Sequence, residues 1–265
     1  MGVPWDATIC ASTGLSIVAS AGQSIFRVAR TEYGPVNPPP RIPGEHPVED
    51  WSRWDTPGRT VYRCSSATGA FVEVLEYIRP DPPAIPLTEL FDDVDDDDAD
   101  TLAEQIAQEL PAHGGMPYRS ISRGWRQSRS LYELQLPDSG WFVDITNAES
   151  ISVVCDQLGP TLLPECGIER LTLSELTGSA EELKKLTTGI ATWIRETVHL
   201  HDGERPHGIV YPSKWGVNFS NWAMWLRRTD DGTGADPLQQ VDTSNIGRHT
   251  KPFVDAAKLR AMTIF

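Results

Sequence analysis

Basic side chains are scarce in this sequence. Its 265 residues include 23 Lys and Arg against 37 Asp and Glu, so the formal net charge is −14 at pH 7. A protein that neutralises the phosphates of a nucleic acid needs a surplus of Lys and Arg on its binding face. The charge balance therefore argues against nucleic acid as a partner.

Long apolar runs and closely paired cysteines are lacking as well. The uncharged stretch between Asp6 and Arg27 contains several Ser, Thr and Gly residues, which make it too polar for the core of a bilayer. No Lys or Arg precedes Ala19-Ser20-Ala21, as the basic segment of a secretion signal would. The four cysteines form no Cys-x-x-Cys pair and are too few for a disulfide scaffold. We expect a cytoplasmic protein with reduced thiols and no membrane partner.

Apolar residues are frequent enough to form a core. They make up 39% of the chain, which also has nine Trp, and this excludes a chain that is disordered throughout. Residues 132–136 and 141–145 alternate on either side of the turn residues Pro137 to Gly140, which predicts a hairpin. Further strands are expected near residues 25–28, 60–62, 208–211 and 222–226.

Apolar residues at helical spacing predict two amphipathic helices. The first follows Ser65 or Ser66, either of which can cap it. The second begins with a capping box of Ser179 and Glu182 and extends to about residue 199. A last helix is expected over residues 253–262. Because strands and helices follow no regular strand-helix-strand rhythm, we predict the α+β class rather than a doubly wound sheet.

An acidic segment interrupts this pattern. Residues 80–128 begin with several prolines and include the run 92–100, in which seven of nine residues are Asp, and we interpret 80–128 as an insertion. The run fails as an EF-hand because Asp98 stands where the calcium loop requires Gly, so a solvated acidic loop is expected. A basic patch follows the acidic run in the sequence. It either pairs with the chain's own acids or binds an anion. Its members are Arg119, Arg123, Arg126 and Arg129.

Several familiar catalytic motifs are absent. The chain has no Gly-x-Ser-x-Gly elbow, no Gly-x-x-x-x-Gly-Lys-Ser/Thr loop and no Gly-x-Gly-x-x-Gly fingerprint. His199, His201 and His207 could converge on a metal, but no Cys or carboxylate stands at a recognised ligand spacing. We therefore expect neither a metal site nor a resident cofactor.

Several segments, taken in order, resemble the two halves of a RES domain. The first half comprises Phe26-Arg27-Val28-Ala29-Arg30, Tyr33-Gly34-Pro35-Val36, Ser52-Arg53-Trp54-Asp55-Thr56-Pro57-Gly58, Thr60-Val61-Tyr62 and Ala70-Phe71-Val72-Glu73-Val74-Leu75. The second comprises His207-Gly208-Ile209-Val210-Tyr211-Pro212-Ser213 and Asn221-Trp222-Ala223. Each fragment is short, and their common order makes the resemblance specific. It implies one RES-like domain over 1–265, with a core of 24–79 and 129–228, the insertion 80–128 and a C-terminal extension, 229–265.

The resemblance implies both a fold and an activity. The fold would be related to ADP-ribosyltransferases, with a mixed β-sheet core and flanking helices, and it would carry the acidic insertion. The activity would consume NAD as a substrate, in the toxin of a toxin-antitoxin pair, for which a cognate antitoxin protein is the partner to test. The family's Arg, Glu and Ser correspond here to Arg27 or Arg53, to Glu73 and to Ser213. The chain departs from the family pattern in its insertion, its C-terminal extension and Asp55, where Asn is common.

The chemistry of NAD cleavage gives these residues roles. Breaking the nicotinamide-ribose bond builds positive charge on the ribose, which a fixed carboxylate at Glu73 would stabilise in the transition state. Arg27 and Arg53 would hold the diphosphate, because the guanidinium fork pairs with phosphate oxygens bidentately. Taken alone, each arginine is better explained by a structural salt bridge, and a helical Glu is usually exposed.

Three further side chains are candidates for contacting the substrate. The ring of Tyr62 could stack on the cationic nicotinamide, or simply pack in the core. Ser213 could hydrogen-bond a ribose or the carboxamide, or be an ordinary turn serine. Tyr33 is a further possible contact. Three functions stay open: NAD cleavage by water or phosphate, transfer of ADP-ribose to a protein, and a catalytically silent binding module.

Overall fold

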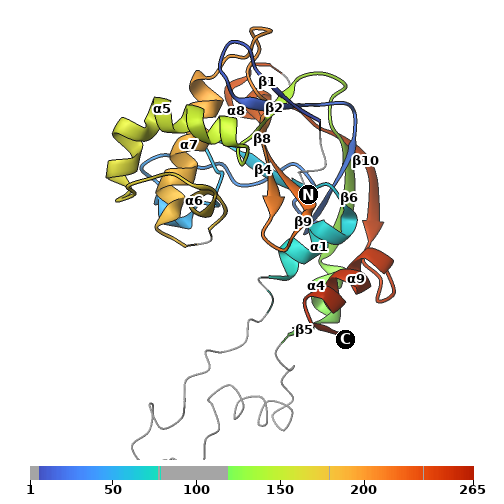
Figure 1. The fold of residues 1–265 in the computed structure, drawn as a ribbon. Helices are drawn as coiled ribbons and strands as arrows, with labels where there is room; N and C mark the ends of the chain where they lie inside the picture. The colour runs from blue at the N-terminus through green and yellow to red at the C-terminus, as the bar shows by residue number, and fades with distance from the viewer. Residues whose placement is uncertain (1–5, 77, 79–118, 179, 235) are drawn as a thin grey trace, which may run out of the picture.

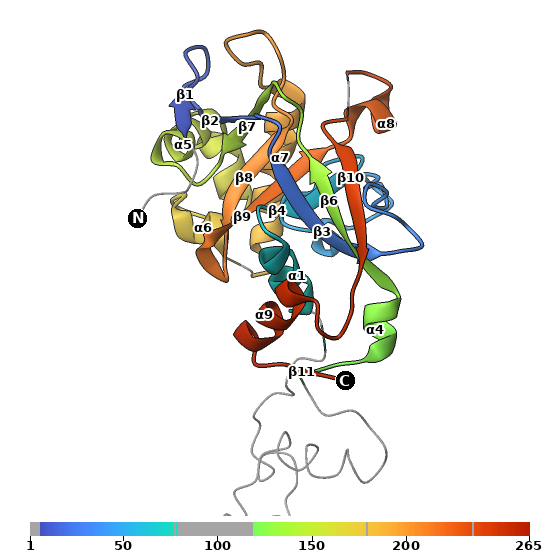
Figure 2. The ribbon, with the colours of Figure 1, turned by 90° about the vertical axis from the view of Figure 1, so that its right-hand side faces the viewer.

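A curled, mixed β-sheet dominates the computed structural model, which describes residues 6–76, 78, 119–178, 180–234 and 236–265 (Figures 1 and 2). Its spatial order is β1-β2-β7-β8-β9-β4-β3-β6-β10, and β7 and β8 are its parallel pair. The strands are β1 (Ala7–Ile9), β2 (Ser16–Ala19), β3 (Ser24–Arg30), β4 (Thr60–Cys64), β6 (Arg129–Gln135), β7 (Trp141–Asp144), β8 (Gly208–Ser213), β9 (Gly216–Trp225) and β10 (Gln239–Asn245).

The helices gather in two groups around this sheet. In Figure 1, α5, α6 and α7 lie together on one side, and α1, α4 and α9 lie together at the opposite end. Their bounds are α1 (Ala67–Leu75), α4 (Arg123–Gln127), α5 (Ala148–Glu165), α6 (Leu173–Thr177), α7 (Leu183–Thr197), α8 (Arg227–Asp231) and α9 (Lys251–Leu259), with a 3-10 turn η1 (Val48–Asp50) and a small parallel pair of β5 (Ser120–Ile121) and β11 (Thr263–Ile264). The architecture confirms the predicted α+β class.

Both faces of the sheet are packed. The first face forms one cluster with the fully buried Ile190 and Ile194 of α7. On the second face, inside the curl, Phe142 of β7 meets Trp222 of β9 edge to face, with ring centroids 4.7 Å apart. A third cluster joins Phe71 of α1 to Phe253 of α9, with ring centroids 5.3 Å apart. The third cluster fixes α1, which begins directly after β4.

Several of the predicted elements are confirmed. Strands β3, β4, β8 and β9 lie where short apolar runs predicted them, and α7 and α9 lie where helical spacing did. Of the two candidate caps for α1, Ser66 is the one used, since its Oγ accepts the backbone N–H of Gly69 at 3.0 Å. The capping box predicted for α7 includes Ser179, which lies outside the described residues. The helix begins at Leu183, and its N-cap residue, Glu182, makes no side-chain capping hydrogen bond.

The hairpin predicted over 132–145 is wrong, although both of its strands exist. Strand β6 pairs with β3 and β10, whereas β7 pairs with β2 and β8. The turn after β2 comes between them: Ser20 N–H donates to Gly140 O at 2.8 Å, and Gly22 N–H donates to Pro137 O at 3.0 Å. These bonds, with Leu136 N–H to Gln23 O at 3.1 Å, form a seam that joins the two arms of the curled sheet.

Several elements were not foreseen, among them α5 and β10. Helix α5 has 18 residues and includes Pro160 and Pro164, which obscure its helical pattern because proline disfavours a helix interior. Strand β10 is exposed at every residue, so it lacks the apolar alternation by which strands are predicted, and its segment reads as a polar tail. Most of the predicted insertion 80–128 lies outside the described residues, since its residues 80–118 are not described. No helix in the described part of the chain is long and apolar enough to span a membrane.

Candidate active site

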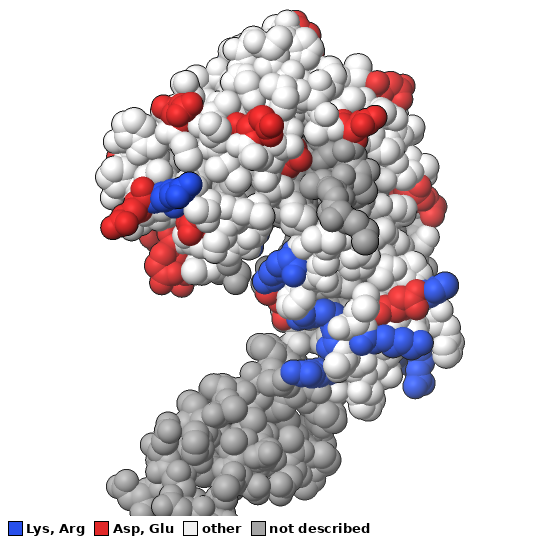
Figure 3. Space-filling model, in the orientation of Figure 1, with Lys and Arg blue, Asp and Glu red and all other residues white. Residues whose placement is uncertain are grey.

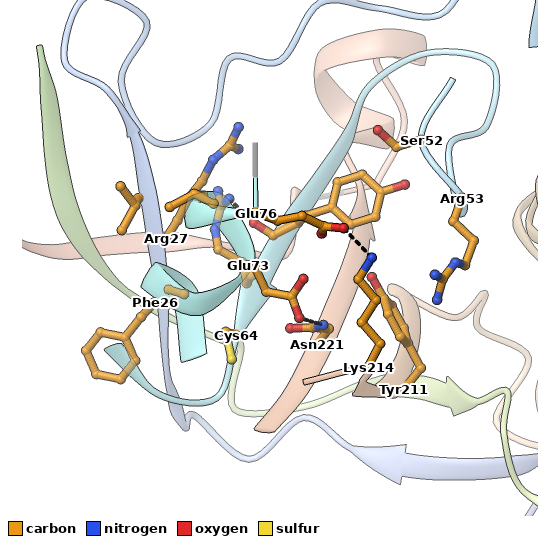
Figure 4. Close-up of a pocket in the computed structure, with 15 residues that line it drawn as sticks. Phe26, Arg27, Ser52, Arg53, Cys64, Glu73, Glu76, Tyr211, Lys214 and Asn221 are labelled. Carbon is orange, nitrogen blue, oxygen red and sulfur yellow. Dashed lines mark hydrogen bonds and ion pairs between the residues drawn. The ribbon is translucent and has the colours of Figure 1, made fainter. Parts of the chain in front are cut away.

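A cavity of about 310 Å³ opens where β4 passes into α1 (Figure 4). Its walls come from segments far apart in the chain: β3, β4, α1, the loop before β4, and the β8-β9 hairpin. Among the predicted site residues, Arg27, Arg53, Tyr62 and Glu73 line it. The fifth, Ser213, reaches it through a hydrogen bond to Glu73.

The carboxylate of Glu73 is held by two side chains of the β8-β9 hairpin. Its Oε1 accepts the hydroxyl of Ser213 at 2.5 Å and the amide of Asn221 at 2.7 Å. Ser213 Oγ in turn accepts the backbone N–H of Trp215 at 3.0 Å, which directs its own proton toward Glu73. Within the described part of the chain, Oε2 has no hydrogen-bond partner. The site thus presents one oriented, half-buried carboxylate with one oxygen free.

Asn221 belongs to one of the segments that resemble a RES domain, but the sequence predicted no role for it. It lies on β9, 6% exposed, in the run of buried residues that ends at Leu226. Its position in a predicted buried strand was the available signal, because a buried amide needs hydrogen-bond partners. The side chain that satisfies it is 148 residues away in the chain.

Two arginines stand side by side on β3 and β4. Arg27 Nη1 donates to Pro35 O at 3.0 Å, and Arg63 Nη2 donates to the same oxygen. Burial lowers the pKa of Arg27 to about 10. Burial and, to a lesser degree, the charge of Arg27 lower the pKa of Arg63 well below its usual value. Arg63 lines the cavity, and the sequence analysis missed it.

Arg53 occupies the other side of the cavity, across from Arg27 (Figure 4). Among the described residues it has neither a hydrogen bond nor an ion pair. Lys214 also lines the cavity and forms an ion pair with Glu76. Four cations, Arg27, Arg53, Arg63 and Lys214, and two carboxylates, Glu73 and Glu76, therefore line the cavity, so the formal charge there is 4 − 2 = +2 in a chain whose total is −14.

Tyr62 presents its ring to the cavity while its hydroxyl is held internally. The hydroxyl donates to Asp55 Oδ1 at 2.8 Å and accepts the backbone N–H of Trp54 at 3.0 Å. Burial and the neighbouring Asp55 raise the pKa of Tyr62 well above its ordinary value. Asp55 also accepts from Arg41 Nε at 2.7 Å, so it ties the loop before β4 to the site. The phenol is therefore no proton donor to a ligand, and only its ring can make contact.

Tyr33 is not brought to the site. Its side chain is 56% exposed and does not belong to the cavity lining. It follows β3 in a turn whose hydrogen bonds are local, from Tyr33 N–H to Arg30 O and from Gly34 N–H to Thr31 O. Tyr33 therefore does not line this cavity, and its contact with a ligand stays a prediction.

The basic patch lies at the α4 and α9 end of the molecule, where Figure 3 shows several Lys and Arg side chains gathered, whereas most charged side chains on the rest of that face are acidic. Arg126 donates to the backbone oxygen of Phe265 at 2.8 Å, and the guanidinium of Arg129 lies 4.7 Å from the centre of the Trp125 ring. No carboxylate from the described residues pairs with Arg123, Arg126 or Arg129. Both roles predicted for the patch, pairing with the chain's own acids and binding an anion, stay predictions.

Histidines do not gather into a metal site in the described residues. His207 Nε2 lies 3.2 Å from Ser139 O, and the ring of His201 packs against Trp141. No group of three or more His, Cys, Asp or Glu able to hold a metal ion occurs in the described part of the chain.

Comparison with protein-family models, curated proteins and solved structures gives no match. A function for the cavity must therefore be inferred from its residues and their geometry.

Proposed function

We propose that this protein is an NAD-degrading enzyme of the RES type, which cleaves the nicotinamide-ribose bond with water or phosphate as acceptor. The observation that carries the proposal is the Glu73 carboxylate, fixed by Ser213 and Asn221 in a cavity that Arg27 and Arg53 also line. The fold would be of the ADP-ribosyltransferase type, and the protein a cytoplasmic toxin neutralised by a cognate antitoxin.

The convergence of the motif residues supports the family assignment. The five RES-like segments that begin at Phe26 and the two that begin at His207 are separated by more than a hundred residues of chain. Arg27, Glu73 and Ser213 nevertheless meet at one cavity. A chance likeness of short segments would not explain why these three residues lie together, whereas a shared active site would.

The charges of the cavity match those of NAD. The dinucleotide has an anionic diphosphate, and cleavage of its glycosidic bond turns the ribose into an oxocarbenium-like cation. Arginines suit the first and a carboxylate suits the second. Because Oε1 of Glu73 is fixed by two donors, Oε2 is the oxygen free to face the developing cation. Such preorganised charge needs no rearrangement during the reaction.

The test is the substitution Glu73→Gln with nicotinamide release as the readout. The amide oxygen of Gln can still accept from Ser213 and Asn221, so the fold should persist while the negative charge is lost. The expected effect is a loss of about a hundredfold or more in kcat, the size typical for one removed stabilising group.

A matched control is Glu133→Gln. Glu133 lies on β6 of the same sheet, accepts a hydrogen bond from Ser24 at 2.7 Å and does not line the cavity. It should release nicotinamide at the rate of the unmodified protein. Equal rates for Glu73→Gln and Glu133→Gln would refute the proposed role of Glu73.

Product analysis identifies the acceptor. Free ADP-ribose indicates water, a phosphorylated ADP-ribose indicates phosphate, and a covalent adduct on an added protein indicates a transferase. Heat of NAD binding in calorimetry without any product would instead indicate a silent binding module and contradict the proposal.

A further inference from the structure

Two cations of the site lie next to each other without a counter-charge. Strands β3 and β4 pair antiparallel at Phe26 and Cys64, which places Arg27 and Arg63 at neighbouring positions of the two strands. Both guanidinium groups donate to the single backbone oxygen of Pro35. Within the described residues, neither forms an ion pair with a carboxylate.

Such an arrangement is unfavourable in the free protein. Like charges opposite each other on adjacent strands repel, and a buried charge without a partner loses its hydration. Arg63 is 3% exposed. Another buried arginine does have carboxylate partners: Arg195, 4% exposed on α7, pairs with Asp231 at 2.9 Å and with Glu196. Arg63 thus lines the cavity as a buried cation that pairs with no carboxylate of the described residues, and a ligand would supply the missing anion.

The number of charges and donors indicates the kind of anion. A guanidinium has five N–H donors, of which Arg27 uses one on the Pro35 oxygen and Arg63 uses two on backbone oxygens. Two adjacent cations with donors left over match a ligand with two adjacent anionic groups. A single carboxylate would neutralise only one of them. A diphosphate supplies both charges in one short unit.

We propose that Arg27 and Arg63 together bind the diphosphate of the dinucleotide, which makes Arg63 a substrate-binding residue of this site. Arg53, predicted as the partner of Arg27, lies across the cavity from it, so it contacts another part of the ligand (Figure 4). The inference rests on the proposed function where it identifies the ligand as NAD. The presence of a diphosphate in the ligand is inferred from the two arginines and does not depend on that function.

The test is calorimetric titration of the full chain with ADP, which carries the diphosphate but no bond that the proposed reaction breaks. Arg63→Lys keeps the charge and loses the fork, and Arg63→Gln loses both. We expect the Kd for ADP to rise by about tenfold in the first and about a hundredfold in the second, as for lost hydrogen bonds to a charged group. Arg248→Gln, which removes an exposed arginine outside the cavity, is the matched control and should leave the Kd unchanged.

A melting experiment separates binding from a purely structural role, since Arg63 is buried and its loss could weaken the fold. ADP should raise the Tm of the unmodified protein, and raise that of Arg63→Lys by clearly less. A lower Tm for Arg63→Lys in the absence of ADP, with an unchanged Kd and an unchanged Tm increase on adding ADP, would show a structural role only and overturn the inference.

The outcome is distinguishable from that of the proposed function. If ADP binds in an Arg63-dependent way but nicotinamide is never released from NAD, the diphosphate site stands and the proposed reaction falls. If nicotinamide is released but ADP does not bind the unmodified protein, the diphosphate site falls while the reaction stands.

Discussion

The direction of the Glu73 carboxylate is decided by Ser213 and Asn221, which donate to the same oxygen. This geometry gives Ser213 a different use from that of a nucleophile. Its hydroxyl proton is donated to Glu73, and its oxygen accepts the backbone N–H of Trp215. Ser213 therefore positions the carboxylate, and the oxygen left over defines where a developing cation would sit.

At the residue scale, Cys64 makes stability depend on pH. It is 1% exposed, and burial raises its pKa from 9.0 to about 11, with a smaller contribution from the charge of Glu73. The unfolded thiol therefore ionises first, so the stability conferred by the neutral thiol is present below pH 9 and is lost as the pH rises toward 11.

The expected loss from Cys64 is about 2–3 kcal/mol across that range, at about 1.4 kcal/mol for each pKa unit. Denaturant unfolding from pH 8 to 11 measures this loss of stability as the difference between the unmodified protein and Cys64→Ala, which lacks the thiol. Parallel stability curves for the two proteins would contradict the assigned shift.

At the element scale, helix α9 of the C-terminal extension supports both parts of the site. Its Phe253 packs against Phe71 of α1, the helix that carries Glu73. After the helix, Arg260 lies 3.4 Å from the centre of the Trp215 ring, beside the hairpin end that carries Ser213. The C-terminal extension is therefore part of the scaffold that brings Glu73 and Ser213 together.

Phe253→Ala should accordingly destabilise the protein by about 3–5 kcal/mol, the usual cost of removing a fully buried Phe. Chemical denaturation measures the change. Phe265→Ala is the control in the same extension, because that side chain is 49% exposed and its loss should cost no more than about 0.5 kcal/mol. Similar losses in both variants would show that α9 is not a structural support of α1.

At the scale of the whole molecule, the sheet curls until its two arms are joined by the seam of Ser20, Gly22, Pro137 and Gly140. The curl brings Phe142 of one arm into a single cluster with Leu134 of the other. It also sets the spacing of β3, β4, β8 and β9, which carry most of the cavity wall. The shape of the site thus depends on closure of the sheet.

Gly140→Ala tests this closure. Gly140 has a φ of +97°, and an added Cβ would lie 2.1 Å from Nε2 of His207, whose ring packs against Phe142. Gly44→Ala is the matched control: its φ is +84° and nothing lies within 4 Å of the added Cβ. The control should lose about 1–2 kcal/mol from backbone strain alone. Gly140→Ala should lose roughly 1–3 kcal/mol more, as an overpacked core does. Equal losses in denaturation would show that the seam adapts freely.

How far the sequence could predict the protein depends on the range of each interaction. Helix α7 was predictable because its apolar residues repeat at the helical period, which is a local property. The sequence predicted strands β6 and β7 individually but not the strands that they pair with, because each pairs with segments remote in the chain. The resemblance singled out Glu73 and Ser213, whereas no local pattern marks Arg63 as different from a structural arginine.

The sequence by itself determined the mixed class of the fold, six strands of the large sheet, the helices α1, α7 and α9, and the residue types available for chemistry, because propensity and periodicity act over a few residues. Only the tertiary structure decided which strands pair, that Arg63 joins Arg27, that Tyr33 stays outside, and that Asn221 shares Glu73 with Ser213. Glu73 and Ser213 are 140 residues apart, and a hydrogen bond across such a distance exists only once the sheet has closed.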